Sequence, residues 1–355
     1  MDKRWNELAR ILVNYSTGVQ CGERVMIAMV ETETLPLVRA VYEQAVKAGA
    51  HVQVQFLSDQ LNRALLRYGT PQQIAWIPEI EAHGMEWADV YIGLRGAHNP
   101  HELADVPDDV LAVHRRVQGE ISSLRWRKTR WCLLRVPNAA FAQQAGTDIE
   151  TMMDMFFDAA LLDWADESRR WREIARILEQ GKHVQVQGRN TDLGFSVAGR
   201  RWVVGDGHIN MPDGEIMTSP VESTLHGYIQ FEWPAVLAGR LVHDVRLEWE
   251  HGKLVSASAS ENQAFLEHVV ATDAGSSLLG EFAFGTNPAV DRFCKDILID
   301  EKIGGTIHVA LGRAYPETGG TNASAIHWDI VKDLRTEGAV LLDGQRVFDQ
   351  GRFLI

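Results

Sequence analysis

Hydrophobic positions in the first half of the chain alternate between helical and strand spacing. Residues 3–15 carry apolar side chains three and four positions apart, which predicts an amphipathic helix. Short apolar runs typical of buried strands then alternate with helical segments. The predicted strands are Val25–Val30, Val52–Leu57, Val90–Leu94 and Trp131–Val136, and the predicted helices are Leu37–Ala48, Gln73–His83, Ile149–Trp164 and Glu167–Glu179. Because strands joined through helices pair in parallel, we expect a mostly parallel sheet covered on both faces.

The pattern changes from Lys182 onward, where apolar and polar residues alternate with the period of two that is typical of strands. Only Gln263–Ala271 and Pro288–Lys295 have helical spacing in this half. The expected fold class is therefore α/β, with an N-terminal α/β domain over residues 1–170 and a β-rich α+β domain over residues 171–355. A length of 355 residues agrees with two domains.

The charge balance disfavours two classes of partner. Acidic side chains outnumber basic ones by 48 to 35, and the formal net charge is −13. Such a surface repels phosphate, so we expect neither nucleic acid nor an anionic membrane as a partner. The basic run Arg125–Arg130, which includes Trp126, is interpreted as a solvated segment. No G-x-G-x-x-G or G-x-x-x-x-G-K-[ST] pattern is present, which disfavours a nucleotide enzyme.

The cysteine content and the N-terminus point to a compartment. The three cysteines lie far apart and form no C-x-x-C pair, which excludes a disulfide framework and a zinc ribbon. The first residues are charged, with no apolar segment of signal-peptide length. We therefore expect a cytoplasmic protein.

Side chains of the types that bind metals recur among the strands of the second half. His327 and Asp329 are two positions apart, so on a strand both face the same side. His308 lies in a separate strand, and Glu215 and Glu281 add carboxylates from two others. Three acids and two imidazoles suit a pair of divalent ions bound mainly through oxygen, such as zinc, cobalt or manganese.

Each of these residues also has a simpler explanation. A single histidine among apolar neighbours, such as His308, is usually a hydrogen-bonded core residue, and Glu215 next to a Pro-Asp-Gly turn would usually be solvated. Glu281 is harder to explain in this way, because burying an unpaired carboxylate in an apolar strand costs several kcal/mol. Together the positions favour a metal site.

Four segments resemble the thermophilic aminopeptidase family, which includes aminopeptidase T and related metal-dependent exopeptidases. A further stretch, Val136–Gly146, resembles the segment that precedes the domain junction in that family. The four segments are Asn210–Ile216, Gly280–Asn287, Asp300–Gly312 and Asn322–Asp329.

The resemblance implies a two-metal aminopeptidase, with Glu215, Glu281, His308, His327 and Asp329 as the metal ligands. It implies that Glu215 or Glu281 accepts a proton from the attacking water, and that Tyr315 hydrogen-bonds the developing oxyanion. It also implies peptide substrates with a free N-terminus, and a homodimer.

The same fold family resembles a branch of mononuclear iron dioxygenases that open dihydroxypyridine rings. In that branch a histidine replaces the acid at the position of Glu281, which is an acid here. The peptidase is therefore the first hypothesis, and the dioxygenase is the alternative.

Overall fold

The computed structural model describes residues 2–125 and 128–355, so Trp126 of the predicted solvated segment lies outside the described residues. The chain divides into two compact units. Unit 1 comprises Met1–Leu161 and Gly207–Pro212, and unit 2 comprises Leu162–Asp206 and Asp213–Ile355. The expected division at residues 170/171 lies within a helix of unit 2. The division of the chain into two domains at this position stays a prediction.

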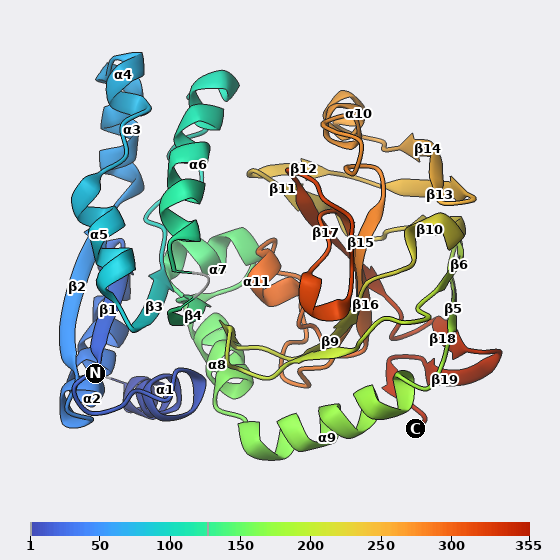
Figure 1. Cartoon of the computed structure of the whole chain (residues 1–355), viewed down its shortest axis with the longest axis horizontal. Coiled ribbons are helices and arrows are strands. Elements are labelled where there is room, and N and C mark those ends of the chain that lie inside the picture. Colours follow the sequence, from blue (N-terminus) through green and yellow to red (C-terminus); the bar gives the residue numbers. More distant parts are fainter. Residues whose placement is uncertain (1, 126–127) are drawn as a thin grey trace. The chain divides into compact units, whose positions relative to one another are not determined.

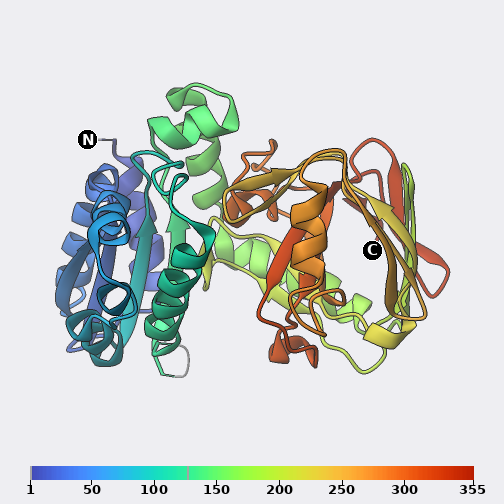
Figure 2. The ribbon, with the colours of Figure 1, turned by 90° about the horizontal axis from the view of Figure 1, so that it is seen from above.

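Unit 1 is built on a parallel sheet, as the sequence predicts (Figure 1). The strands lie in the order β2-β1-β3-β4-β8, and helices flank the sheet on both sides (Figure 2). The elements are α1 (Arg4–Ile11), the π-helix η1 (Leu12–Ser16), β1 (Arg24–Val30), the 3-10 helix η2 (Thr32–Thr34), α2 (Leu35–Lys47), β2 (His51–Leu57), α3 (Asp59–Tyr68), α4 (Pro71–Ile74), α5 (Glu79–Trp87), β3 (Val90–Arg95), α6 (Asp108–Ser123), β4 (Arg130–Arg135), α7 (Ala139–Ala145), α8 (Ile149–Ala160) and β8 (Asn210–Met211).

Unit 2 is β-rich, again as predicted. It contains an antiparallel sheet of eight strands, β14-β13-β10-β6-β5-β18-β19-β20, and one of five strands, β17-β16-β15-β9-β7. The elements are α9 (Trp164–Leu178), β5 (His183–Gly188), β6 (Thr191–Ser196), β7 (Val203–Gly205), β9 (Glu215–Thr218), η3 (Glu222–Thr224), β10 (His226–Gln230), β11 (Ala235–Leu237), β12 (Arg240–Val242), β13 (Arg246–Glu250), β14 (Lys253–Ser258), α10 (Gln263–Val270), β15 (Leu279–Gly285), α11 (Ile297–Asp300), β16 (Thr306–Gly312), η4 (Pro316–Thr318), β17 (His327–Asp333), β18 (Gly338–Leu342), β19 (Gln345–Asp349) and β20 (Arg352–Phe353).

An aromatic core joins the two sheets of unit 2. Phe282 and Phe284 of β15 pack against Phe195 of β6 and Phe348 of β19, with ring centroids 5.1 Å apart in each pair. Because side chains alternate along a strand, Glu281, between Gly280 and Phe282, faces the opposite side of β15. One face of the five-stranded sheet therefore forms the core, and the other is free to hold polar groups.

Two of the predicted helices differ in the structure. The helix predicted over Pro288–Lys295 is wrong: α11 begins only at Ile297, and the backbone N–H groups of Cys294 and Asp296 donate to the Asp300 carboxylate instead of to helical carbonyls. The segment Gln73–His83 forms two helices, α4 and α5, because Pro78 disfavours helical geometry at the residue before it.

Candidate metal centre

Four neighbouring strands bring the predicted ligands to one face of the five-stranded sheet. Glu281 of β15 pairs with Ala310 of β16, and Ala310 pairs in turn with Asp329 of β17. Directly paired residues face the same side of a sheet, and so do residues two positions apart. His308, two positions from Ala310, and His327, two positions from Asp329, therefore share this face with both acids.

Small residues leave room between these side chains. One strand partner of each of three polar residues is small: Ala283 for His308, Gly312 for His327 and Gly285 for Glu215. A β-carbon on Gly285 would lie 2.3 Å from the carbonyl oxygen of Ile303. The glycine thus allows the loop after α11 to approach the sheet closely.

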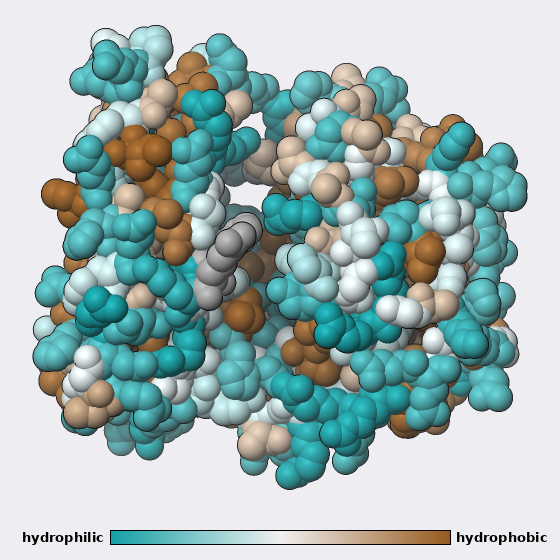
Figure 3. Space-filling view, viewed as in Figure 1, coloured by the Kyte–Doolittle hydropathy of each residue, from teal (hydrophilic) through white to brown (hydrophobic). Residues whose placement is uncertain are grey.

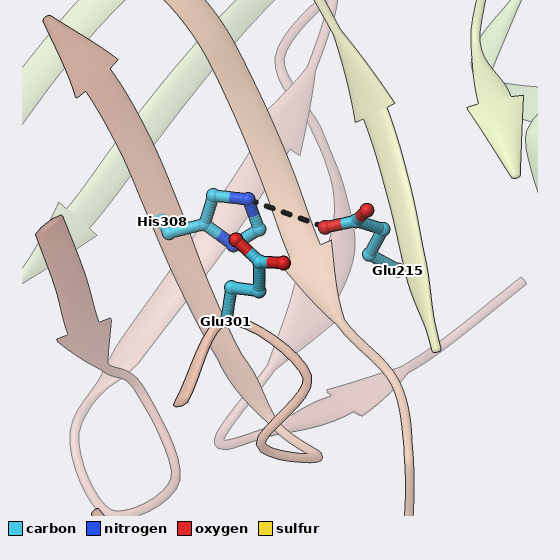
Figure 4. Close-up of side chains that lie close together, drawn as sticks. All are labelled: Glu215, Glu301 and His308. Atoms are coloured by element: carbon cyan, nitrogen blue, oxygen red, sulfur yellow. Dashed lines mark ion pairs between the residues drawn. The ribbon is translucent and has the colours of Figure 1, made fainter. Parts of the chain in front are cut away.

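The first ligand group consists of Glu215, Glu301 and His308, which come from β9, the end of α11 and β16 and point toward one another (Figure 4). One ligand atom from each residue lies within 4.8 Å of the other two. His308 Nε2 is 3.4 Å from Glu215 Oε2. All three side chains lie in the interior, and His308 is fully buried.

The second ligand group consists of Glu281, His327 and Asp329. His327 Nε2 lies 3.2 Å from Glu281 Oε2 and 3.4 Å from Asp329 Oδ2. Its other ring nitrogen, Nδ1, donates to the Arg313 carbonyl oxygen at 2.7 Å. This hydrogen bond fixes the ring so that Nε2 faces the carboxylates, which is the usual way a metal-binding histidine is oriented.

Glu281 links the two groups. Its Oε1 lies 3.4 Å from His308 Nε2 of the first group, and its Oε2 faces His327 of the second. A carboxylate with one oxygen toward each of two groups is placed to serve both.

Two residues near the first group were not predicted from the sequence. Glu301 supplies the second carboxylate of this group, and the Lys302 ammonium lies 2.7 Å from Glu215 Oε1 and 2.8 Å from Glu301 Oε1. In the sequence both belong to an Asp-Glu-Lys run before Gly304-Gly305, which looks like a solvated turn. A signal was available in the close spacing of Glu301 and His308, but only the fold shows that α11 turns Glu301 toward the sheet.

Tyr315, which only the family resemblance suggested, lies beside the second group. Its ring centroid is 4.8 Å from that of His327. Burial, together with the carboxylates of Glu281 and Asp329, raises the pKa of the Tyr315 hydroxyl, so the phenol keeps its proton. The hydroxyl can therefore act as a hydrogen-bond donor at neutral pH.

Burial and neighbouring charges shift the protonation of the ligand groups. Burial raises the pKa of Glu215 to about 8, although Lys302 opposes the shift. Burial disfavours the charged form of His308, but Glu281 and Glu215 outweigh it and raise its pKa to about 9. For Glu281 burial is outweighed by the two imidazoles, and its pKa is lowered. With no ion bound, the imidazoles thus hold protons that a cation would displace.

The residues fit divalent metal ions. Within the described residues, both ring nitrogens of His308 and Oδ1 of Asp329 are buried and make no hydrogen bond of good geometry. Buried polar atoms without partners are costly, and a bound cation would satisfy one of the His308 nitrogens and the Asp329 oxygen. Four carboxylates and two imidazoles form an oxygen-rich donor set that accepts zinc, cobalt or manganese.

Known proteins are similar to this chain in sequence and in fold. The family model of the thermophilic metalloproteases (M29) matches residues 1–353. Aminopeptidase 2 of Geobacillus stearothermophilus is 25% identical, with 99% of this chain and 98% of the relative covered, and Aminopeptidase AmpS of Bacillus subtilis is 23% identical over 99% and 98%.

Two solved structures resemble the fold. Wild-type AmpT from Thermus thermophilus has a TM-score of 0.89 at 21% identity, covering 99% of both chains. The 2,5-dihydroxypyridine dioxygenase from Pseudomonas putida has a TM-score of 0.63 at 16% identity, covering 99% of this chain and 96% of that one. Likenesses at this level of identity show the fold alone, whereas the family model matches almost the whole sequence. The chain therefore belongs to the thermophilic metalloprotease (M29) family, as the sequence segments predicted.

Proposed function

We propose that this metallopeptidase is an aminopeptidase that uses two divalent ions per chain. The observation that supports two ions is Glu281, whose two oxygens face His308 and His327 in separate ligand groups. We assign the first ion to Glu215, Glu301 and His308, and the second to Glu281, His327 and Asp329, with Glu281 as the bridging residue. The curated relatives, named as aminopeptidases, support exopeptidase activity.

The chain's own residues have distinct roles in this proposal. When bound, the ions supply Lewis acidity toward the peptide carbonyl and lower the pKa of the attacking water. We assign the proton-acceptor role to Glu215 or Glu281, the two carboxylates that face His308. Tyr315 donates a hydrogen bond to the oxygen that becomes negative in the transition state.

The substrate is a peptide with a free N-terminus. An uncharged α-amino group can bind a metal ion, and a charged one can pair with an acid of the second group. Either contact would hold the first residue at the catalytic groups and confine cleavage to the first peptide bond. Zinc, cobalt and manganese are all compatible with this donor set.

We further propose a homodimer. Of the sixteen large apolar side chains that are exposed in the described residues, ten belong to residues 35–80 of unit 1, and Figure 3 shows apolar surface over the helices α3–α5. Strand β2 is an edge of its sheet, paired within the described part of the chain only with β1, and residues 51–57 include no Lys, Arg, Asp, Glu or Pro to protect that edge. Light scattering on the purified protein should give twice the mass of the chain.

We propose the cytoplasm as the compartment, because no disulfide joins Cys21, Cys132 or Cys294 in the described part of the chain. In the described part of the chain, no helix combines the length and apolar character needed to cross a bilayer. Cell fractionation tests this assignment.

The test of the function is hydrolysis of aminoacyl-p-nitroanilides before and after chelation. We expect release of p-nitroaniline from a free aminoacyl substrate, loss of activity with chelator, and recovery with cobalt, manganese or zinc. The same substrate with an acetylated amino group is the matched control and should not be cleaved. Full activity without metal, or equal cleavage of the acetylated substrate, would contradict the proposal. Oxygen consumption with a dihydroxypyridine, and no cleavage of any aminoacyl substrate, would favour the dioxygenase.

A further inference from the structure

Lys302 is a fully buried cation beside the first ligand group. Its ammonium lies 3.2 Å from Asp213 Oδ1, 2.7 Å from Glu215 Oε1 and 2.8 Å from Glu301 Oε1. The lysine side chain has no exposed surface, and that of Asp213 has almost none. Such a lysine cannot reach a substrate, so it acts through the three carboxylates that it contacts.

The backbone fixes Lys302 and its acids relative to one another. The Asn287 side chain donates to the Asp213 carbonyl oxygen, and the Asn287 backbone N–H donates to the Lys302 carbonyl oxygen. Gly214 lies against the same residue, since a β-carbon there would be 2.8 Å from the Asn287 β-carbon. The turn before β9 and the turn after α11 are therefore held together around the ammonium.

The net negative charge around Lys302 equals the charge that one divalent ion neutralises. Asp213, Glu215 and Glu301 bring three negative charges and Lys302 one positive charge, which leaves two to be neutralised. Glu281 and Asp329 of the second group also bring two. Without Lys302, Asp213 and Glu301 would lose the ammonium beside them, and Glu215 would keep only the His308 imidazole, 3.4 Å away, until an ion bound. Buried negative charge that is not fully compensated is strongly destabilising.

We propose that Lys302 is a positioning residue that acts as a permanent counter-ion of the first ligand group, keeping Glu215 and Glu301 in place when no metal is bound. The fold of unit 2 is then stable without metal, and the group is ready to bind an ion. This inference depends on the proposed metal site. A lysine with a purely structural role would contribute the same stability with and without metal.

The test compares melting temperatures of Lys302→Met and the wild type, each stripped by chelator and each saturated with zinc. Met keeps the length of the side chain and removes the charge. We expect Lys302→Met to melt on the order of 10 °C below the wild type without metal. Zinc should remove more than half of this difference, because the ion supplies the missing positive charge.

Lys332→Met is the matched control. Lys332 is also fully buried in unit 2, but it bonds to Glu232 and to the Arg189 and Gln230 carbonyls, outside both ligand groups. Its loss should lower the melting temperature equally with and without zinc. The proposal is overturned if the deficit of Lys302→Met is likewise unaffected by zinc, or is absent.

A second variant decides the matter if Lys302→Met does not fold. Asp213→Asn keeps the shape of the side chain and leaves one negative charge instead of two for the ion to neutralise. We expect unchanged or higher stability without metal and about tenfold weaker binding of the first zinc ion in calorimetry. Unchanged zinc affinity would refute the counter-ion role. Failure of the proposed function would look different, since the wild type itself would then bind no zinc.

Discussion

Glu281 and Asp329 are paired with the same residue, Ala310, from opposite sides of β16. The alanine is fully buried, and its small side chain leaves the space over β16 open. Since paired residues share a face, the two carboxylates meet over the alanine, where His327 joins them. The size of residue 310 thus controls whether the second ligand group can assemble.

Ala310→Leu should fill this space. We expect the variant to lose the second ion, giving about one ion per chain, and to lose roughly 1–3 kcal/mol of stability from overpacking. Metal analysis and denaturant unfolding measure the two effects. Ala310→Gly, the control, keeps the space open and should retain both ions. Full metal content in Ala310→Leu would show that the space is not needed.

Glu281→Gln should affect both ions, whereas Glu301→Gln should affect only one. Glu281 faces the imidazoles of both groups, but Glu301 belongs to the first group alone. We therefore expect much weaker binding of both ions in the first variant, and about one ion per chain in the second. Isothermal titration calorimetry with zinc separates these outcomes. Equal effects of the two substitutions would argue against a bridging Glu281.

Tyr315→Phe should lower kcat by a factor on the order of 100 to 1,000 without changing metal content. The hydroxyl is a donor that strengthens its bond in the transition state, so KM should change little. The ring stays in contact with His327, so the fold should be retained. Steady-state kinetics together with metal analysis test this prediction. Wild-type turnover in the variant would assign Tyr315 a packing role only.

The stability of the metal-free protein should fall as pH rises. The pKa of Glu215 is raised to about 8 and that of His308 to about 9, each above its unfolded value. A raised pKa stabilises the fold at low pH, and this contribution is lost as pH rises through the folded value. The melting temperature with chelator should therefore decrease between about pH 6.5 and about pH 9. With zinc the trend should reverse, because fewer protons compete with the ion. A metal-free melting temperature that increases over this range would contradict the shifts.

The sequence singled out most residues of the candidate site because strand alternation is a local property. The two-residue spacing of His327 and Asp329 places both on one face of β17, and Glu281 is conspicuous in an apolar strand whose other face packs against aromatic rings. The parallel sheet of unit 1 and the β-rich character of unit 2 also followed from local periodicity, because the spacing of apolar residues along one segment indicates its secondary structure.

Glu301 and Lys302 could not be predicted in the same way. They lie in a turn, and their burial depends on glycine at 285 and on Asn287, which hold distant segments together. The wrong helix over Pro288–Lys295 has a different cause, since the Asp300 carboxylate accepts hydrogen bonds from the backbone N–H groups of Cys294 and Asp296. Local bonds from backbone to side chain replaced helical ones where the periodicity favoured a helix.

The number of divalent ions bound per chain tests the central claim most directly. Protein stripped by chelator, dialysed against a small excess of zinc and analysed by inductively coupled plasma mass spectrometry should hold about two ions per chain, one for each ligand group. A value of one at saturation, or none, would contradict the two-metal site.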